Sequence, residues 1–240
     1  MILDRLSVEG LITETEPIAA GMTRIRVAGE GLRALTCTPG QQLRVFTGDP
    51  GASSLRARLG DLRTYSVWRF DPELGALDLC VLDHLGAGPG ARWARAARPG
   101  QAVRFRGPEG SFTLRPDAPY HLFAGEETAS VALGALLAAV PADSRVYGAV
   151  ETATAGARLP LHRAGELAFV VRGDASPVSS AVLVDAVRAL DLPDEPGVGY
   201  VAGEARTVQL VRDHLVRERG WPRRSVVTKP FWTPGKTGME

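Results

Sequence analysis

The stretch LRPDAPYHLFAGEETAS, residues 114–130, decides how this chain is organised. Pro116 and Pro119 interrupt strand pairing, because proline has no backbone N–H to donate to a ladder. The apolar run YHLFA that follows is typical of a buried strand. It leads through GEETAS into an Ala-, Leu- and Val-rich stretch of helical length that ends at Pro141. The chain therefore divides here, and we expect domains of residues 1–116 and 117–240.

Residues 1–116 read as short β segments separated by turn residues. The segments are LSVEGLITETEPI (6–18), TRIRVAG (23–29), QQLRVFTG (41–48), RTYSVWRF (63–70), ALDLCVLD (76–83) and QAVRFRG (101–107). The sequences DPELG and RPGQ supply turns between them. One short helix is expected around residues 91–97. This spacing suits a β-barrel or a β-sandwich.

Residues 117–240 alternate between strand and helix patterns. After the first βα unit, strands are expected in RVYGAVE (145–151), ELAFVVRG (166–173) and GVGYVA (197–202). The last strand leads through GEA into the helix TVQLVRDHLVRERG, in which Val208, Val211 and Leu215 share one face and Gly220 is placed to end it. Alternating strands and helices predict a parallel sheet, whose ligands bind at the carboxyl ends of its strands.

Composition sets limits on function. The chain has 240 residues, 45% hydrophobic and 23% charged, with a formal net charge of +1, so no global field draws it to nucleic acid or to an anionic membrane. No apolar run approaches the roughly 20 residues of a membrane span, and the N-terminus has no secretory signal pattern, so we expect a cytoplasmic protein.

The metal-binding side chains are few. Two cysteines, Cys37 and Cys80, exclude a four-cysteine zinc or iron–sulfur site and do not form a CxxC pair. The histidines show no helical pairing; they are His84, His121, His162 and His214. We therefore expect no protein-held metal, and a redox protein of this composition must borrow its redox centre.

Two segments could hold an anionic, planar cofactor. In RTYS (63–66), Tyr65 could lie against a planar ring, Ser66 could bond the ring edge and Arg63 could neutralise a phosphate, although an ordinary amphipathic strand explains the same residues. In HLGAGPGARWA (84–94), three glycines and a proline precede a short helix, so that backbone N–H groups and the helix start could meet a phosphate. A plain glycine turn is the alternative, and the GxGxxG fingerprint is absent.

Taken in order with GPEGSF (107–112), these segments resemble the siderophore-interacting, FAD-dependent branch of the ferredoxin reductase superfamily. The resemblance implies an antiparallel FAD-binding β-barrel followed by a nicotinamide-binding parallel-sheet α/β domain, and it covers nearly the whole chain. The residues that it places around FAD are Arg63, Thr64, Tyr65, Ser66, His84, Gly88, Pro89, Gly90, Ala91, Trp93, Gly110 and Ser111.

The second half extends the resemblance. AGEETA and YVAGEA resemble the family's turns at the nicotinamide cleft, which implies cofactor roles for Glu127, Thr128, Gly203 and Glu204. The C-terminal TKPFWTPG resembles the family's KGYWxxG. Through it the resemblance implies that Lys229 contacts an anionic iron chelate, with Trp232 near the cofactor. Arg44, in QQLRVF, falls on a basic position of the family and would be a second cation for the chelate.

Several positions depart from the family's pattern. Trp68 stands where a second arginine is usual, Ala91 where a serine would meet phosphate, and Val131 where a proline follows the nicotinamide turn. Pro230 and Phe231 replace glycine and tyrosine. The first two changes bear on FAD binding, and the others bear on nicotinamide and siderophore recognition.

The resemblance implies an FAD-dependent oxidoreductase that passes electrons from NADPH or NADH to a ferric siderophore and releases Fe(II), with no side chain acting as acid or base. The alternatives are a flavoenzyme with another small-molecule acceptor and a noncatalytic flavin- or chelate-binding module. Arg172 and Arg206 could each meet the 2′-phosphate of NADPH, so the sequence does not choose between the two dinucleotides.

Overall fold

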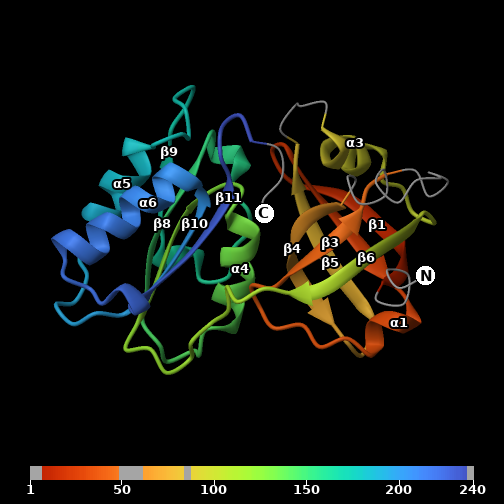
Figure 1. The fold of residues 1–240 in the computed structure, drawn as a ribbon, viewed down its shortest axis with the longest axis horizontal. Helices are drawn as coiled ribbons and strands as arrows, with labels where there is room; N and C mark the ends of the chain where they lie inside the picture. Colours follow the sequence, from red (N-terminus) through yellow and green to blue (C-terminus); the bar gives the residue numbers. More distant parts are fainter. Residues whose placement is uncertain (1–6, 49–61, 84–87, 237–240) are drawn as a thin grey trace. The chain divides into compact units, whose positions relative to one another are not determined.

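The computed structural model describes residues 7–48, 62–83 and 88–236. The chain forms two compact units, Met1–Ser111 and Phe112–Glu240 (Figure 1). The boundary expected between residues 116 and 117 lies a few residues further along the chain. Each unit has its own hydrophobic core, and the two are taken in turn.

The first unit is a closed antiparallel barrel. Its strands are β1 (Val8–Ala19), β2 (Met22–Ala28), β3 (Gln42–Phe46), β4 (Leu62–Asp71), β5 (Ala76–Leu82) and β6 (Ala102–Glu109). They follow the order β1-β2-β5-β4-β3-β6, and β6 pairs with β1 to close the ring. All six expected β segments are confirmed, and the choice between barrel and sandwich is settled, because closure leaves no sheet edge unpaired.

Alternation along the strands builds the barrel core. Leu43 and Val45 of β3 are fully buried, whereas Arg44 between them is exposed. Among the described residues of this unit, two helices accompany the barrel, α1 (Glu30–Arg33) and α3 (Pro89–Ala96). The helix expected around residues 91–97 is α3, whose Trp93 joins the barrel core.

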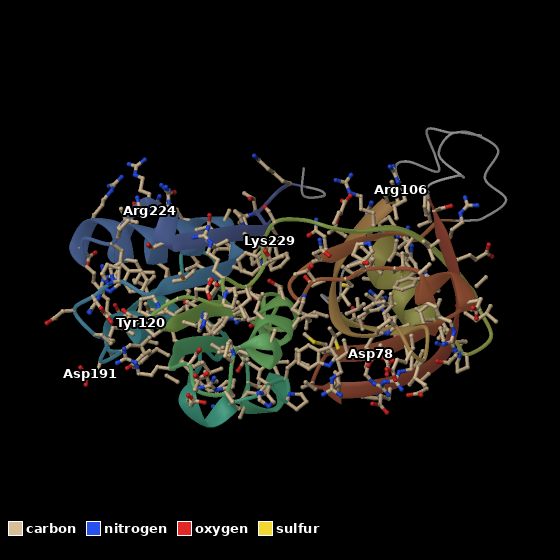
Figure 2. All side chains as sticks on the ribbon, turned by 90° about the horizontal axis from the view of Figure 1, so that it is seen from below. Asp78, Arg106, Tyr120, Asp191, Arg224 and Lys229 are labelled. Atoms are coloured by element: carbon tan, nitrogen blue, oxygen red, sulfur yellow. The ribbon has the colours of Figure 1, made fainter. Side chains whose placement is uncertain are left out.

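The barrel wall buries the charged side chain of Asp78. Asp78 of β5 (Figure 2) is 1% exposed and accepts hydrogen bonds from the guanidinium groups of Arg24 and Arg26 at 2.8 to 3.2 Å. Both arginines also bond carboxylates of β1, with Glu14 bonded to each. These partners satisfy the carboxylate that the strand buries.

The second unit is a parallel α/β layer. Its strands are β7 (His121–Glu126), β8 (Val146–Thr152), β9 (Ala168–Val171), β10 (Val198–Glu204) and β11 (Val226–Trp232), in the order β11-β10-β7-β8-β9. Its helices are α4 (Ser130–Ala139), α5 (Ala181–Arg188) and α6 (Ala205–Asp213), the last continued by a π-helical turn at His214–Glu218. Short 3₁₀ turns lie at Ala155–Ala157, Ala164–Glu166 and Arg223–Ser225.

The helices cover both faces of this sheet. Figure 1 shows α4 on the face opposite α5 and α6. On the α5 and α6 face, Leu122 and Val201 pack with Leu183 and Val211 in one buried cluster. No described helix is long and apolar enough to cross a membrane.

The expected parallel sheet is confirmed, with two additions. The sequence pattern gave no indication of α5, and it treated residues 226–232 as a tail, whereas they form β11. Pro230 inside this segment argues against a central strand. It is accommodated because β11 pairs only with β10 and forms the sheet edge.

Candidate functional site

In the barrel, the candidate site is built on β4. Register pairs Tyr65 with the buried Leu43, and Tyr65 packs against the barrel core. Thr64 and Ser66 lie on the other face of the strand, because successive strand side chains alternate. Ser66 is the register partner of Gln42. Arg63 shares the face of Tyr65, and its Nη1 donates to the Leu62 carbonyl at 2.7 Å.

The start of α3 meets Tyr65 at a glycine. A Cβ on Gly90 would lie 2.6 Å from the Tyr65 hydroxyl and 3.3 Å from Cγ of Arg63, so no larger residue fits there with Tyr65 in place. One turn on, the ring of Trp93 lies 5.5 Å from that of Tyr65, centroid to centroid. The glycine-containing helix start and the RTYS strand, separate in the sequence, therefore form one surface.

This surface has the features that a flavin nucleotide requires. Pro89 occupies the first turn of α3, no acidic residue lies in that turn, and no side chain among the described residues caps it. Its N–H groups and dipole therefore remain available to a phosphate, with Arg63 beside them. Burial raises the pKa of Tyr65 above its usual value, so the phenol stays neutral as a flat, uncharged wall. The residues present fit FAD.

The remaining barrel residues occupy the neighbouring strands. Arg44 of β3 pairs in register with Thr64 on one side and with Arg106 (Figure 2) on the other. Its Nε donates to Glu109 at 2.6 Å, with about half of the side chain exposed. Gly110 and Ser111 follow β6 directly and are both exposed. His84 lies outside the described residues, and Ala91 and Gly88 belong to the start of α3.

In the second unit, the candidate site lies where β7 and β10 end. These strands are neighbours in space, and the strand order reverses between them, which is the position where open α/β sheets bind ligands. Glu126 ends β7 with its carboxylate 2% exposed. The backbone N–H of Thr128 donates to it at 2.7 Å, the Thr128 hydroxyl donates as well, and Nε1 of Trp232 donates at 3.0 Å.

Burial raises the pKa of Glu126, although the donors from Thr128 and Trp232 act in the opposite direction. Gly203 of β10 approaches this carboxylate with a φ of +126°, and a Cβ there would lie 2.9 Å from Oε1 of Glu126. The hydrogen bond from Nε1 to Glu126 holds the indole of Trp232, at the end of β11, beside the AGEETA and YVAGEA turns.

Glu204 caps α6. Its carboxylate accepts from the backbone N–H groups of Arg206 and Thr207 at 2.8 Å and of Ser179 at 3.1 Å. Burial acts to raise the pKa of Glu204, but these donors outweigh it and the pKa is lowered. Glu204 is therefore an ionised cap, and its side chain is committed to backbone groups.

Lys229 (Figure 2) lies among aromatic rings on β11. Its Nζ is 5.4 Å from the ring centroid of Phe231 and 5.9 Å from that of Phe112. Phe231, which stands where the family has tyrosine, thus supplies a ring face to the ammonium group. Pro230 is the register partner of Gly203 in β10.

Two other residues that differ from the family's pattern are buried. Trp68 is 6% exposed and falls where the β4–β5 register shifts between Val67 and Arg69, and the Arg69 guanidinium lies 5.8 Å from the indole centroid. Val131 is 4% exposed in α4. Both positions hold packed apolar side chains in this chain.

The sequence motifs identified individual segments of the site but not the residues on other strands that lie next to them. Gln42 and Arg106 were not among the expected site residues, and Glu126 was expected only as part of the GEET turn. In the structure Glu126 anchors Trp232, and the other two flank Ser66 and Arg44 in register. The double carboxylate in GEET was a usable signal for Glu126. Strand register, which a single sequence does not reveal, was required for the other two.

Two family models match this chain. The siderophore-interacting protein model matches residues 118–235, and the siderophore-interacting FAD-binding domain model matches residues 53–112. The chain belongs to the siderophore-interacting protein family. The match of residues 53–112 to a siderophore-interacting FAD-binding domain supports FAD as a cofactor.

Several proteins are similar to this family member. Ferric vibriobactin reductase ViuB of Vibrio cholerae is 26% identical over 238 residues, which cover 91% of this chain and 86% of ViuB. The mycobactin import ATP-binding/permease protein IrtA of Mycolicibacterium smegmatis is 28% identical over 235 residues, or 95% of this chain and 26% of IrtA. The chain therefore spans about a quarter of the length of IrtA.

Solved structures share the fold. A siderophore utilization protein from T. fusca has a TM-score of 0.83 at 24% identity, covering 98% of this chain and 95% of that one. The flavohem-like FAD/NAD-binding domain of a Vibrio cholerae nitric oxide dioxygenase has a TM-score of 0.74 at 17% identity, with 94% and 98% covered. The two-unit plan is thus a ferredoxin reductase-like fold.

Proposed function

We propose that this siderophore-interacting protein is an FAD-dependent oxidoreductase that takes electrons from NAD(P)H and delivers them to a ferric siderophore. The observation that carries the proposal is the surface where Gly90 of α3 meets Tyr65, because it joins a flat wall to a helix start that no described side chain caps. Tyr65, Gly90 and Arg63 would hold FAD there, and the chemistry that the flavin would supply is conversion of a two-electron hydride donor into single-electron reduction of Fe(III).

The barrel residues would hold the flavin in defined ways. Tyr65 would form one wall for the ring system, with Trp93 supporting it from behind. The backbone N–H groups of Gly90 and Ala91 would bind phosphate together with Arg63, so the missing serine hydroxyl at Ala91 removes only one of several donors. Thr64, Ser66, Gly110 and Ser111 are the further polar groups that we assign to this site.

The nicotinamide dinucleotide would bind at the carboxyl ends of β7 and β10. The turn containing Glu127 and Thr128 and the turn containing Gly203 and Glu204 frame this position. Trp232 lies beside them, held by the Glu126 carboxylate. In this arrangement the two turns orient the dinucleotide, and no side chain is required to move a proton.

The acceptor would be an anionic chelate. Arg44 is a half-exposed cation on the barrel, and Lys229 is a cation held between two ring faces in the second unit. We assign each cation, within its own unit, to attraction of a carboxylate- or catecholate-rich ferric complex. The reduction of ferric vibriobactin named for ViuB supports a ferric siderophore as the acceptor here.

The visible absorption spectrum of the purified protein tests the flavin directly, since bound FAD gives a yellow protein with flavin bands. Rapid mixing with NADH or NADPH under anaerobic conditions should then bleach those bands. If neither dinucleotide bleaches the flavin, the proposed electron source is wrong. If the reduced protein is reoxidised by a panel of ferric siderophores no faster than free reduced flavin is, the acceptor is another molecule.

A further inference from the structure

A buried ion network lies at the carboxyl edge of the sheet, next to the proposed dinucleotide position. Arg172, directly after β9, donates from both terminal nitrogens to the Glu127 carboxylate, and Nη1 lies 2.5 Å from Oε2. The same Nη1 donates to Glu151 of β8 at 3.3 Å. The Arg172 and Glu127 side chains are 8% and 9% exposed, and that of Glu151 is fully buried.

Glu151 is also bonded through its other carboxylate oxygen. The Ser180 hydroxyl, at the start of α5, donates to Oε2 of Glu151 and also accepts from the backbone N–H of Leu183 at 3.2 Å. The Ser180 N–H in turn donates to the Thr207 hydroxyl at 3.0 Å. Arg172 therefore cannot turn toward a ligand without leaving the buried carboxylates of Glu127 and Glu151 without their cation.

Among the described residues, carboxyl groups outnumber guanidinium groups at this edge, although burial raises the pKa of Glu126 and so favours its neutral form. Glu126 and Glu151 are register partners at the ends of β7 and β8, Glu127 follows β7, and Glu204 ends β10. Against these carboxylates the network sets one guanidinium group, that of Arg172. The pKa of Arg172 is raised, first by its hydrogen bond to Glu127, so its charge is fixed and fully used within the network.

We propose that this edge selects NADH over NADPH, an inference that rests on the proposed nicotinamide function. In dinucleotide-binding sheets, an acidic residue after the second strand favours a free ribose 2′-hydroxyl, whereas a nearby arginine accommodates a 2′-phosphate. Here Glu151 lies one residue before the end of β8, the second strand of the sheet in chain order. Its two oxygens are bonded to Arg172 and Ser180, so it acts through its charge, and Arg172 is already neutralised by two carboxylates. A 2′-phosphate would bring further negative charge to a site that has no uncommitted cation in this network.

Arg206 is the other arginine that the sequence offered for a 2′-phosphate. It lies at the exposed start of α6, where its Nη1 donates to Gln209 at 2.7 Å. Its backbone N–H belongs to the Glu204 cap, so the residue sits beside an ionised carboxylate. Substitution of Arg206 separates its contribution to NADP⁺ binding from that of the Arg172 network.

Isothermal titration of the oxidised holoprotein with NAD⁺ and with NADP⁺ measures the selection without turnover. NADP⁺ is expected to bind at least about tenfold more weakly than NAD⁺, which corresponds to ~1.4 kcal/mol. Glu151→Gln keeps an oxygen for the Ser180 hydroxyl but removes one negative charge. In this variant the ratio of the NADP⁺ dissociation constant to the NAD⁺ dissociation constant should fall by about threefold or more, because the site repels the 2′-phosphate less strongly.

A matched control is Glu166→Gln, which makes the same change of charge in an Arg–Glu pair of the same unit. Glu166 bonds Arg163, whose guanidinium also donates to the carbonyls of Pro141 and Ser144, before the start of β8. This variant should leave the NAD⁺ to NADP⁺ ratio unchanged. Melting temperatures of both variants show whether each retains its fold.

Equal or tighter binding of NADP⁺ by the unaltered protein overturns the inference, whatever the variants do. If Arg206→Gln then abolishes that binding, Arg206 is the reader of the phosphate. In that case bleaching of the flavin by NADPH would leave the proposed function standing. If neither dinucleotide binds and neither bleaches the flavin, the inference and the nicotinamide step of the proposed function fail together.

Discussion

Replacing Gly90 by alanine tests whether the Tyr65 surface is the flavin site. The added Cβ would lie 2.6 Å from the Tyr65 hydroxyl, whereas ordinary contact begins at 3.4 Å, so the phenol must move by about 0.8 Å. Without a ligand this displacement costs little, because the hydroxyl is the far end of a rotatable side chain. Alanine also favours the helix by up to ~1 kcal/mol over glycine.

With FAD bound, the displacement has a larger effect. If Tyr65 is a wall of the flavin site, the crowded ring must either intrude on the flavin or strain its own position. Overpacking of this kind costs about 1–3 kcal/mol. The dissociation constant for FAD should therefore rise about 5- to 150-fold, while the melting temperature of the flavin-free protein stays the same or increases.

Fluorescence titration of the flavin-free protein with FAD measures this effect, and the structure provides two controls. Gly31→Ala adds the same methyl group in α1 of the same unit, where the nearest described atoms lie at 3.5 and 3.9 Å, and should leave affinity unchanged. Combining Gly90→Ala with Tyr65→Phe removes the clashing hydroxyl and leaves the ring carbon Cζ at 3.7 Å, an ordinary contact. The double variant should therefore bind FAD more tightly than Gly90→Ala alone.

Unchanged FAD affinity in Gly90→Ala, together with a melting temperature equal to that of the parent protein, would refute the reasoning. It would mean that Tyr65 relocates freely and does not contact the flavin. A loss of affinity that Tyr65→Phe fails to relieve would place the clash elsewhere on α3.

Three further predictions concern stability and reactivity. Asp78→Ala should lower the free energy of unfolding in urea by about 2 kcal/mol, because two arginines of β2 lose their shared carboxylate but keep partners on β1. Burial raises the pKa of Cys37 to about 11 and that of Cys80 to about 12, so alkylation at pH 8 should be slow in the native protein and rapid in denaturant, as mass spectrometry would show. Because the pKa of Glu126 is raised above 4.5, its contribution to stability is fully present below that pH and is lost as the pH rises through the raised value. The difference in melting temperature between Glu126→Gln and the parent should accordingly change over this range, and a pH-independent difference would contradict the assignment.

The sequence by itself determined the two fold classes and most of their elements. Period-two alternation and turn residues located the six barrel strands, and the prolines at residues 116 and 119 fell close to the boundary of the two units. These signals are local, because side-chain alternation and helix amphipathicity depend on neighbours a few residues apart. The same locality explains why β11 was missed, since Pro230 disfavours a strand unless the strand is known to lie at an edge.

Only the tertiary structure decided which site residues act together. It placed Gly90 against Tyr65, brought Trp232 to Glu126, and showed that Arg172 is bound by Glu127 and Glu151. From the sequence, Arg172 was a cation available to a phosphate. Its partners come from two other strands, and a charge that is free in a sequence becomes committed once folding buries it next to opposite charges that the chain order keeps far apart.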